Sequence, residues 1–257
     1  MGIAKGLITA FWLQLAFCVA VIVMISRARK GAKVPPIYKV PGLDAMDEAI
    51  GRATEMGRPV HFSPGIMGVQ DAQTLAALAV LGYIAKKCAE YGTQLIATNK
   101  VTTVYPIAEA IVRQAFVDAG KADAFKPEYV RFISEDQFAY TTGVTAIMRR
   151  ERPAANIMIG SFWAETIIIA ENAFKAGAIQ IAGTANTFQI QVLMVSCDYV
   201  LIGEEMYAAT AYLTKEPVLL GSLIAQDWAK ALAEGLIIVG ALLETIKSPL
   251  LKNILSR

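Results

Sequence analysis

The chain has 257 residues, of which 55% are apolar and 18% charged, and its formal net charge is +2. Basic residues gather at both ends and leave the middle net acidic, so nucleic acid is excluded as an expected partner. A single histidine excludes a zinc site built from several histidines, and the three cysteines lack the spacing of a metal or redox pair. We therefore expect no metal and no cofactor.

The first predicted element is the uncharged run LITAFWLQLAFCVAVIVMI over residues 7–25. As a helix it would extend about 28 Å, close to the roughly 30 Å of a bilayer's hydrocarbon core. The basic residues that follow it at once are Arg27, Arg29, Lys30 and Lys33. A cleaved signal peptide would carry small residues there, so we expect residues 1–33 to form a retained transmembrane anchor with a basic flank. Since basic residues concentrate on the cytoplasmic side, we predict a single-pass protein of the cell membrane whose main domain is cytoplasmic.

The anchor is followed by a proline-rich segment and then by a long alternating pattern. Residues 34–42, VPPIYKVPG, predict an extended linker, and a helix capped by Asp44 is expected to run to Gly57. Within residues 43–216, short apolar runs alternate with helical segments. The expected strands are 59–62, 94–98, 129–133, 156–159, 178–182 and 199–202. The expected helices are 70–91, 105–119, 136–149, 162–176 and 186–196.

This alternation predicts an α/β domain, because crossover helices join parallel strands and cover both faces of their sheet. We predict a Rossmann-like, doubly wound, mostly parallel six-stranded sheet, and a flavodoxin-like strand order fits the pattern equally. Helix caps are expected at Asp71, at Ser161 and at a capping box of Ser134 with Gln137. The glycines expected to end helices in the left-handed conformation are Gly92, Gly120 and Gly177.

Residues 217–257 predict a C-terminal apolar or amphipathic, membrane-associated helix and a basic tail. One polar stripe at helical spacing consists of Gln226, Asp227, Lys230 and Glu234. The uncharged run after Glu234 is too short to span a bilayer, and a second span would place the basic tail outside. The sequence leaves open whether residues 218–246 lie on the membrane, pack in an oligomer or form a second span.

Open parallel sheets bind ligands beyond the carboxyl ends of their strands. There the loop GTANTFQ at 183–189 places hydroxyl and amide groups at an expected helix N-terminus, which suits an anion or polar ligand. The expected ligand-binding residues are Gly183, Thr184, Asn186, Thr187, Gly203, Glu204 and Glu205. Helix caps and first turns require the same residue types, so a structural role stays open. No nucleotide-binding or nucleophile motif is present, no catalytic residue is predicted, and His61 is expected to be a core or interface histidine.

Two long segments carry a resemblance to a known family. They are PGLDAMDEAIGRATEMGRPVHFSPG and AIQIAGTANTFQIQVLMVSCDYVLIGEEMYAA, and the likeness runs from the proline-rich linker to Gln226-Asp227-Trp228. The chain resembles a prokaryotic family of membrane-anchored proteins defined as a domain of unknown function. The resemblance implies a membrane protein without an assigned activity and brings no catalytic residues.

The function that these features favour is a membrane-anchored cytoplasmic α/β protein that self-associates. The apolar body and helices such as 162–176 offer more apolar surface than one sheet needs, which predicts a scaffold or a structural subunit of a membrane assembly. The expected partners are the lipid bilayer and further copies in a homo-oligomer, or the other subunits of a larger complex. The alternative is a membrane-tethered enzyme or small-ligand sensor that uses the crevice at the carboxyl ends of the strands.

Overall fold

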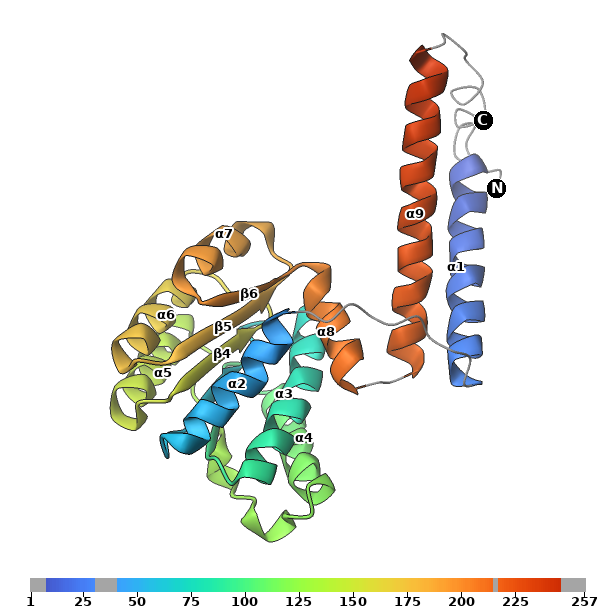
Figure 1. The fold of residues 1–257 in the computed structure, drawn as a ribbon. Helices are drawn as coiled ribbons and strands as arrows, with labels where there is room; N and C mark the ends of the chain where they lie inside the picture. Colours follow the sequence, from blue (N-terminus) through green and yellow to red (C-terminus); the bar gives the residue numbers. More distant parts are fainter. Residues whose placement is uncertain (1–7, 31–40, 215–216, 246–257) are drawn as a thin grey trace. The chain divides into compact units, whose positions relative to one another are not determined.

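The computed structural model of the chain describes residues 8–30, 41–214 and 217–245. Its helices and strands fall into two units, one made of the first and last helices and the other made of everything between them. Figure 1 shows both units.

The first unit is a pair of long helices, α1 (Ile8–Arg29) and α9 (Pro217–Thr245), which pack side by side and run antiparallel (Figure 1). The two backbones approach closely at Gly221, where a Cβ atom would lie 2.7 Å from the Cα of Ile25. Within the described ranges, one helix is long and apolar enough to cross a membrane, at Phe11–Arg29 in α1. The apolar N-terminal helix that the sequence predicts is therefore present.

The second unit is built on a six-stranded sheet of order β3-β2-β1-β4-β5-β6 in which every neighbouring pair is parallel. The strands are β1 (Val60–Ser63), β2 (Leu95–Asn99), β3 (Val130–Phe132), β4 (Ala155–Ile159), β5 (Ile179–Thr184) and β6 (Tyr199–Ile202). This order has the Rossmann-like arrangement, so the predicted doubly wound α/β sheet is confirmed and the flavodoxin-like order is wrong.

Helices cover both faces of the sheet (Figure 1). One face carries α2 (Pro41–Glu55), α3 (Ala72–Tyr91), α4 (Tyr105–Asp118) and α8 (Glu204–Thr214); the other carries α5 (Gln137–Glu151), α6 (Glu165–Ala176) and α7 (Thr187–Ser196). Two short 3-10 turns, η1 (Ala122–Ala124) and η2 (Pro127–Tyr129), lead into β3. Because side chains alternate along a strand, Phe62 joins the larger core under α2, α3, α4 and α8, whereas Ser63 points toward α5.

Several predicted helix ends are confirmed. Asp71 caps α3 by accepting a hydrogen bond from the backbone N–H of Gln73 at 2.9 Å. Gly92 and Gly177 end α3 and α6 in the left-handed conformation, and Gly120 adopts it just after α4.

Other predicted caps are wrong. The helix expected to be capped by Asp44 begins at Pro41, and the part of the predicted linker that lies in residues 34–40 falls outside the described residues. The cap of α5 is Asp136, whose carboxylate accepts from the N–H of Ala139 at 2.8 Å, while Ser134 accepts from the N–H of Asp136. The carboxylate reaches the first turn of the helix directly, so no capping box with Gln137 forms.

Ser161 does not cap a helix either, because α6 begins at Glu165 and its N-cap residue Ala164 makes no side-chain cap. The hydroxyl of Ser161 instead lies 2.5 Å from the Asp71 carboxylate. This contact joins the loop after β4 to the start of α3.

Candidate functional site

The carboxyl ends of β1 and β4 mark the point where the chain switches from one face of the sheet to the other, the usual ligand crevice of this fold. Here the two loops touch. The N–H of Ile66 donates to the carbonyl of Ser161 at 2.9 Å, and a Cβ atom on Gly160 would overlap the carbonyl oxygen of Pro64. Gly160 has a φ of +130°, which only glycine adopts easily. Direct backbone contact therefore closes the space between these two loops.

The first turn of α3 adds a second connection across this edge. The side-chain oxygen of Gln73 accepts from the hydroxyl of Thr184 at 3.2 Å and from the N–H of Ala185 at 2.7 Å. Together with the contact between Asp71 and Ser161, these bonds tie the loops after β1, β4 and β5 to one another. Ser161 with Asp71 and Thr184 with Gln73 thus form two hydrogen-bonded pairs at this edge.

The first four predicted ligand residues lie together at the end of β5 and the start of α7. Gly183 and Thr184 are buried in the strand, and Thr187 is the first residue of the helix. Asn186 is the N-cap of α7, and its side chain accepts from the N–H of Phe188 at 3.2 Å. The amide oxygen of Asn186 thus has the capping role that the sequence left open.

The other three predicted ligand residues follow β6. Gly203 has a φ of +57°, and its N–H donates to the carbonyl of Thr184 at 2.9 Å. Glu204 and Glu205 stand in the first turn of α8, where Glu205 accepts from the N–H of Ile202 at 3.0 Å. The structure therefore brings all seven residues to adjacent strand ends. That they bind a ligand stays a prediction.

A buried row of polar side chains crosses the sheet beneath α5, and its hydrogen bonds have one direction. The carbonyl of Ser196 can only accept, so the Gln180 amide donates to it at 3.0 Å and accepts from Asn156 at 3.3 Å. Asn156 then accepts from Nδ1 of His61 at 2.8 Å, and Nε2 of His61 lies 2.9 Å from Oγ1 of Thr98, which donates to it when the ring is neutral. His61 is thus a core histidine with both ring nitrogens bonded, as predicted.

The row continues through Tyr140 of α5, whose hydroxyl lies 3.3 Å from Oγ1 of Thr98 and 2.8 Å from Oγ of Ser63. Burial lowers the pKa of His61 to about 4, although its bond to Asn156 acts in the opposite direction. His61 is fully buried, so it is neutral at physiological pH and without access to solvent. It serves the core, where it joins two strands.

One polar atom at this edge has no partner within the part of the chain that the structure describes. Oδ1 of Asn99, at the end of β2, is buried and accepts no hydrogen bond. No group of three or more His, Cys, Asp or Glu side chains among the described residues is placed to hold a metal ion.

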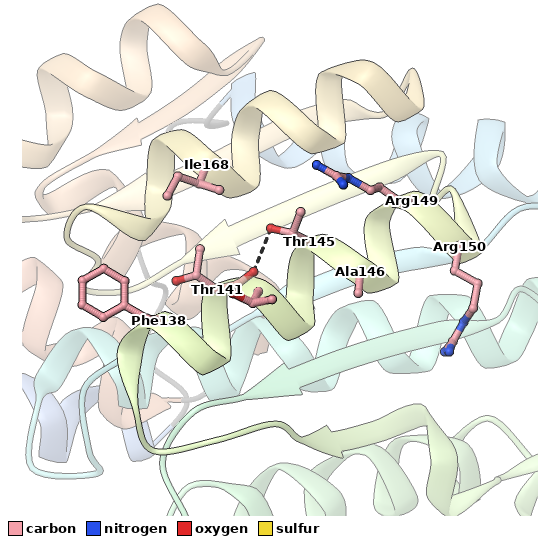
Figure 2. A pocket seen from close by; sticks show the side chains of 8 residues that line it. Phe138, Thr141, Thr145, Ala146, Arg149, Arg150 and Ile168 are labelled. Atoms are coloured by element: carbon pink, nitrogen blue, oxygen red, sulfur yellow. Dashed lines mark hydrogen bonds between the residues drawn. The ribbon is translucent and has the colours of Figure 1, made fainter.

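The outer side of the α5, α6 and α7 layer carries a groove of about 610 Å³ (Figure 2). It is lined by Phe138, Thr141, Thr142, Thr145, Ala146, Arg149, Arg150 and Ile168. The hydroxyls of Thr141 and Thr145 donate to the carbonyls of Gln137 at 2.6 Å and of Thr141 at 2.7 Å, within α5 itself. Phe138 stands at one end and the two arginines at the other, with Ile168 of α6 above the α5 residues (Figure 2).

Beside this groove, α7 forms an apolar ridge. Leu193 is its one buried residue, while Phe188 is 83% exposed and Val195 is 91% exposed. α6 adds exposed Ile167 and Phe174 between groove and ridge. We refer to the groove, these two side chains and the ridge as the α5–α7 face. Sequence reasoning noted the excess apolar surface of α6, but it did not single out α7.

The fold and this face define a Rossmann-like α/β protein that carries an apolar N-terminal helix and a large exposed apolar surface. The chain belongs to the family DUF6754, a domain of unknown function, whose family profile matches residues 3–255. The predicted resemblance to a domain of unknown function is thereby confirmed over nearly the whole chain. No curated protein and no solved structure matches the chain.

Proposed function

We propose that this protein is a membrane-anchored, self-associating scaffold or structural subunit in the cell membrane of a prokaryote, with its α/β unit in the cytoplasm. The length and composition of α1 support the anchor. Arg27 and Arg29 in its last turn, followed by Lys30, support the cytoplasmic placement of the chain that follows.

The observation that carries self-association is the exposure of the α5–α7 face. Phe138, Phe174 and Phe188 are each more than three-quarters exposed, and Val195 is almost fully exposed. Burying one such side chain in an interface contributes roughly 1.5–3 kcal/mol before the cost of association. Several large apolar side chains exposed on one helix layer are typical of protein or membrane contacts.

Charge favours a protein over a membrane as the partner of this face. α7 contains no charged residue, and two exposed cations of α5 and α6 are paired with carboxylates, Arg150 with Glu151 and Lys175 with Glu171. Anionic lipid headgroups attract surfaces with an excess of basic charge, so this balanced surface suits a protein partner better than a bilayer.

The α5–α7 face also complements itself. α6 contacts both α5 and α7 and lies between them, so a two-fold axis through α6 exchanges the positions of the other two helices. The apolar ridge of α7 in one copy would then lie over the groove of the second copy, and the reverse contact would form at the same time. An isologous dimer results, which is the commonest symmetry of soluble homo-oligomers. Because α5 and α7 run in the same direction, Phe188 would meet Phe138 of the partner groove, where two aromatic rings attract each other.

The test is the mass of the full chain in mild detergent, measured by light scattering with the detergent contribution subtracted. The wild-type chain should be an oligomer, and Phe188→Glu with Val195→Glu should reduce its mass. The matched control is Leu75→Glu, an exposed apolar residue in the first turn of α3 on the opposite layer, which should leave the mass unchanged. A monodisperse wild-type monomer would contradict the proposal. A double variant that is folded by circular dichroism and keeps the wild-type mass would also contradict it.

The alternative is a membrane-tethered enzyme or small-ligand sensor that uses the strand ends. Its support is the unpartnered Asn99 oxygen at the end of β2, together with the predicted residues that gather after β5 and β6. Titration of the purified chain with phosphate and nucleotides, followed by its thermal stability, tests this function. A rise in melting temperature that Asn99→Leu removes would favour it over the scaffold.

A further inference from the structure

We infer that the polar stripe of α9 (Gln226, Asp227, Lys230 and Glu234) is a second interface, which pairs inside the bilayer with the same stripe of a second copy of this chain. The inference rests on the proposed membrane anchoring, and it concerns a surface separate from the α5–α7 face.

The first step is the placement of the stripe around α9. The side of α9 that contacts α1 is a seam of small residues, Gly221, Ala225 and Ala229, at four-residue spacing. Gly221 and Ala225 are buried, and the Gly221 backbone touches α1 at Ile25. Small residues at this spacing let two membrane helices approach closely.

At about 100° per residue, the stripe is centred roughly 150° around α9 from this seam. It therefore points away from α1. The side chain of Asp227 is 74% exposed and that of Lys230 is 45% exposed. The helix pair thus packs through its small residues but presents its charged residues outward, which a lone pair of helices in lipid does not tolerate.

The second step is the depth of the stripe. Gly221 of α9 lies level with Ile25 of α1, and the two helices run antiparallel. At about 1.5 Å per residue, Asp227 and Lys230 lie roughly 9 and 14 Å further along the pair. These positions are level with the middle of the apolar Phe11–Arg29 segment. An anchor formed by α1 therefore carries the stripe to the middle of the bilayer, where charged side chains occur almost only against protein or a water-filled cavity.

The third step is the identity of the partner. The stripe carries both signs, with the Lys230 ammonium 3.8 Å from the Asp227 carboxylate and Glu234 one turn further on. Two copies inserted in the same orientation place each residue level with its own counterpart. Gln226 meets Gln226, and an amide can both donate to and accept from an amide. The two Lys230 ammonium groups lie between the levels of Asp227 and Glu234, so the four carboxylates of the two copies offset the repulsion between two ammonium groups.

Disulfide cross-linking in lipid vesicles tests the pairing. In a Cys18→Ala background, which removes the exposed cysteine of α1, Gln226→Cys should give a cross-linked dimer under mild oxidation. Ala225→Cys is the matched control, because Ala225 is next to Gln226 in the chain and is buried in the seam, and it should cross-link at least tenfold less. Equal cross-linking at both positions, or none at Gln226→Cys, overturns the inference.

A charge exchange tests the chemistry of the pairing. Asp227→Lys should reduce the Gln226→Cys cross-link at least tenfold, and Asp227→Lys combined with Lys230→Asp should restore it. If the double exchange does not restore the cross-link although the protein still resists carbonate extraction, the proposed pairing is wrong.

Two further measurements separate this inference from the proposed function. The Gln226→Cys cross-link should persist when Phe188→Glu and Val195→Glu are present, because the two interfaces are separate. If light scattering detects an oligomer that Gln226→Cys does not cross-link, the stripe interface is wrong and the scaffold proposal stands. A wild-type chain that carbonate releases from membranes would remove both.

Discussion

Replacing His61 should flatten the dependence of folding stability on pH. In the folded chain the imidazole is fully buried and its pKa is lowered to about 4, from an ordinary value of 6.5. The unfolded chain therefore binds a proton more tightly than the folded chain does. The stability that neutral His61 confers is complete above pH 6.5 and is lost as the pH falls toward 4.

The magnitude follows from the two pKa values. The full difference of about 2.5 pKa units corresponds to roughly 3.4 kcal/mol, at about 1.36 kcal/mol per unit. Between pH 7 and pH 5 the folded state still carries a largely neutral His61, and the loss is about 2 kcal/mol. Carboxylates also contribute to the pH dependence, but their share is common to the wild-type chain and the variant.

The assay is urea unfolding of the full chain in mild detergent, measured by pulse proteolysis at pH 7 and pH 5. His61→Gln should be less stable at pH 7, since Thr98 or Asn156 loses a buried partner at a cost of about 1–3 kcal/mol. Its loss of stability from pH 7 to pH 5 should be about 2 kcal/mol smaller than that of the wild-type chain. Equal losses would refute the reasoning.

A direct measurement does not depend on the variant. The chain contains one histidine, so a single imidazole resonance reports on His61 in a protein purified without a histidine tag. We expect this resonance to stay in its neutral position down to about pH 5. A titration midpoint near 6.5 in the folded protein would show that the polar row does not bury the ring.

Three other substitutions test the loops and the helix pair. Gly160→Ala should destabilise the chain by about 3 kcal/mol or more, because its φ is strained for alanine and the new Cβ overlaps a carbonyl oxygen. Gly92→Ala, which has open space around it, should cost about 1 kcal/mol, and urea unfolding compares the two variants. Asp71→Ala should cost about 1–2 kcal/mol in the same assay, since the cap of α3 and the bond to Ser161 are both lost, and a neutral result would contradict their role. Gly221→Leu should lower the melting temperature in detergent by separating α1 from α9, whereas Gly235→Leu, with no neighbour within 4 Å, should not.

The sheet could be predicted because each strand is a short apolar run between turn residues, and that pattern depends on local sequence alone. Helix starts were harder to predict. Ser161 has the right residue type to begin a helix, yet its hydroxyl contacts Asp71, and α6 begins with Glu165, which accepts from the N–H of Trp163 at 2.7 Å. The same hydroxyl could cap the following helix or bond the Asp71 carboxylate of another loop, and only the fold decides between these two roles.

The polar row beneath α5 depends on strand register. His61, Asn156 and Gln180 are level with one another on three adjacent strands, which requires the strand order and the pairing to be known. Each residue alone is one polar side chain in an apolar strand, and that signal was noted only for His61. The sequence of α7 is as apolar as that of a buried helix, so its exposure could not be predicted from the sequence. The exposure follows instead from the place of α7 at the border of its layer.

The two proposed interfaces together determine how far an assembly grows. Each is isologous, so either one alone stops at two copies, because each copy then uses its single complementary surface. A chain that has both interfaces can bind one neighbour through the α5–α7 face and another through the α9 stripe. Growth then continues until a closed ring forms, or without limit in the plane of the membrane. Wild-type particles should therefore exceed a dimer, and Phe188→Glu with Val195→Glu should reduce them to dimers held by α9. If the wild-type chain is a dimer and this double variant is a monomer, the α5–α7 face is the sole interface. The polar stripe of α9 then does not pair with its own copy.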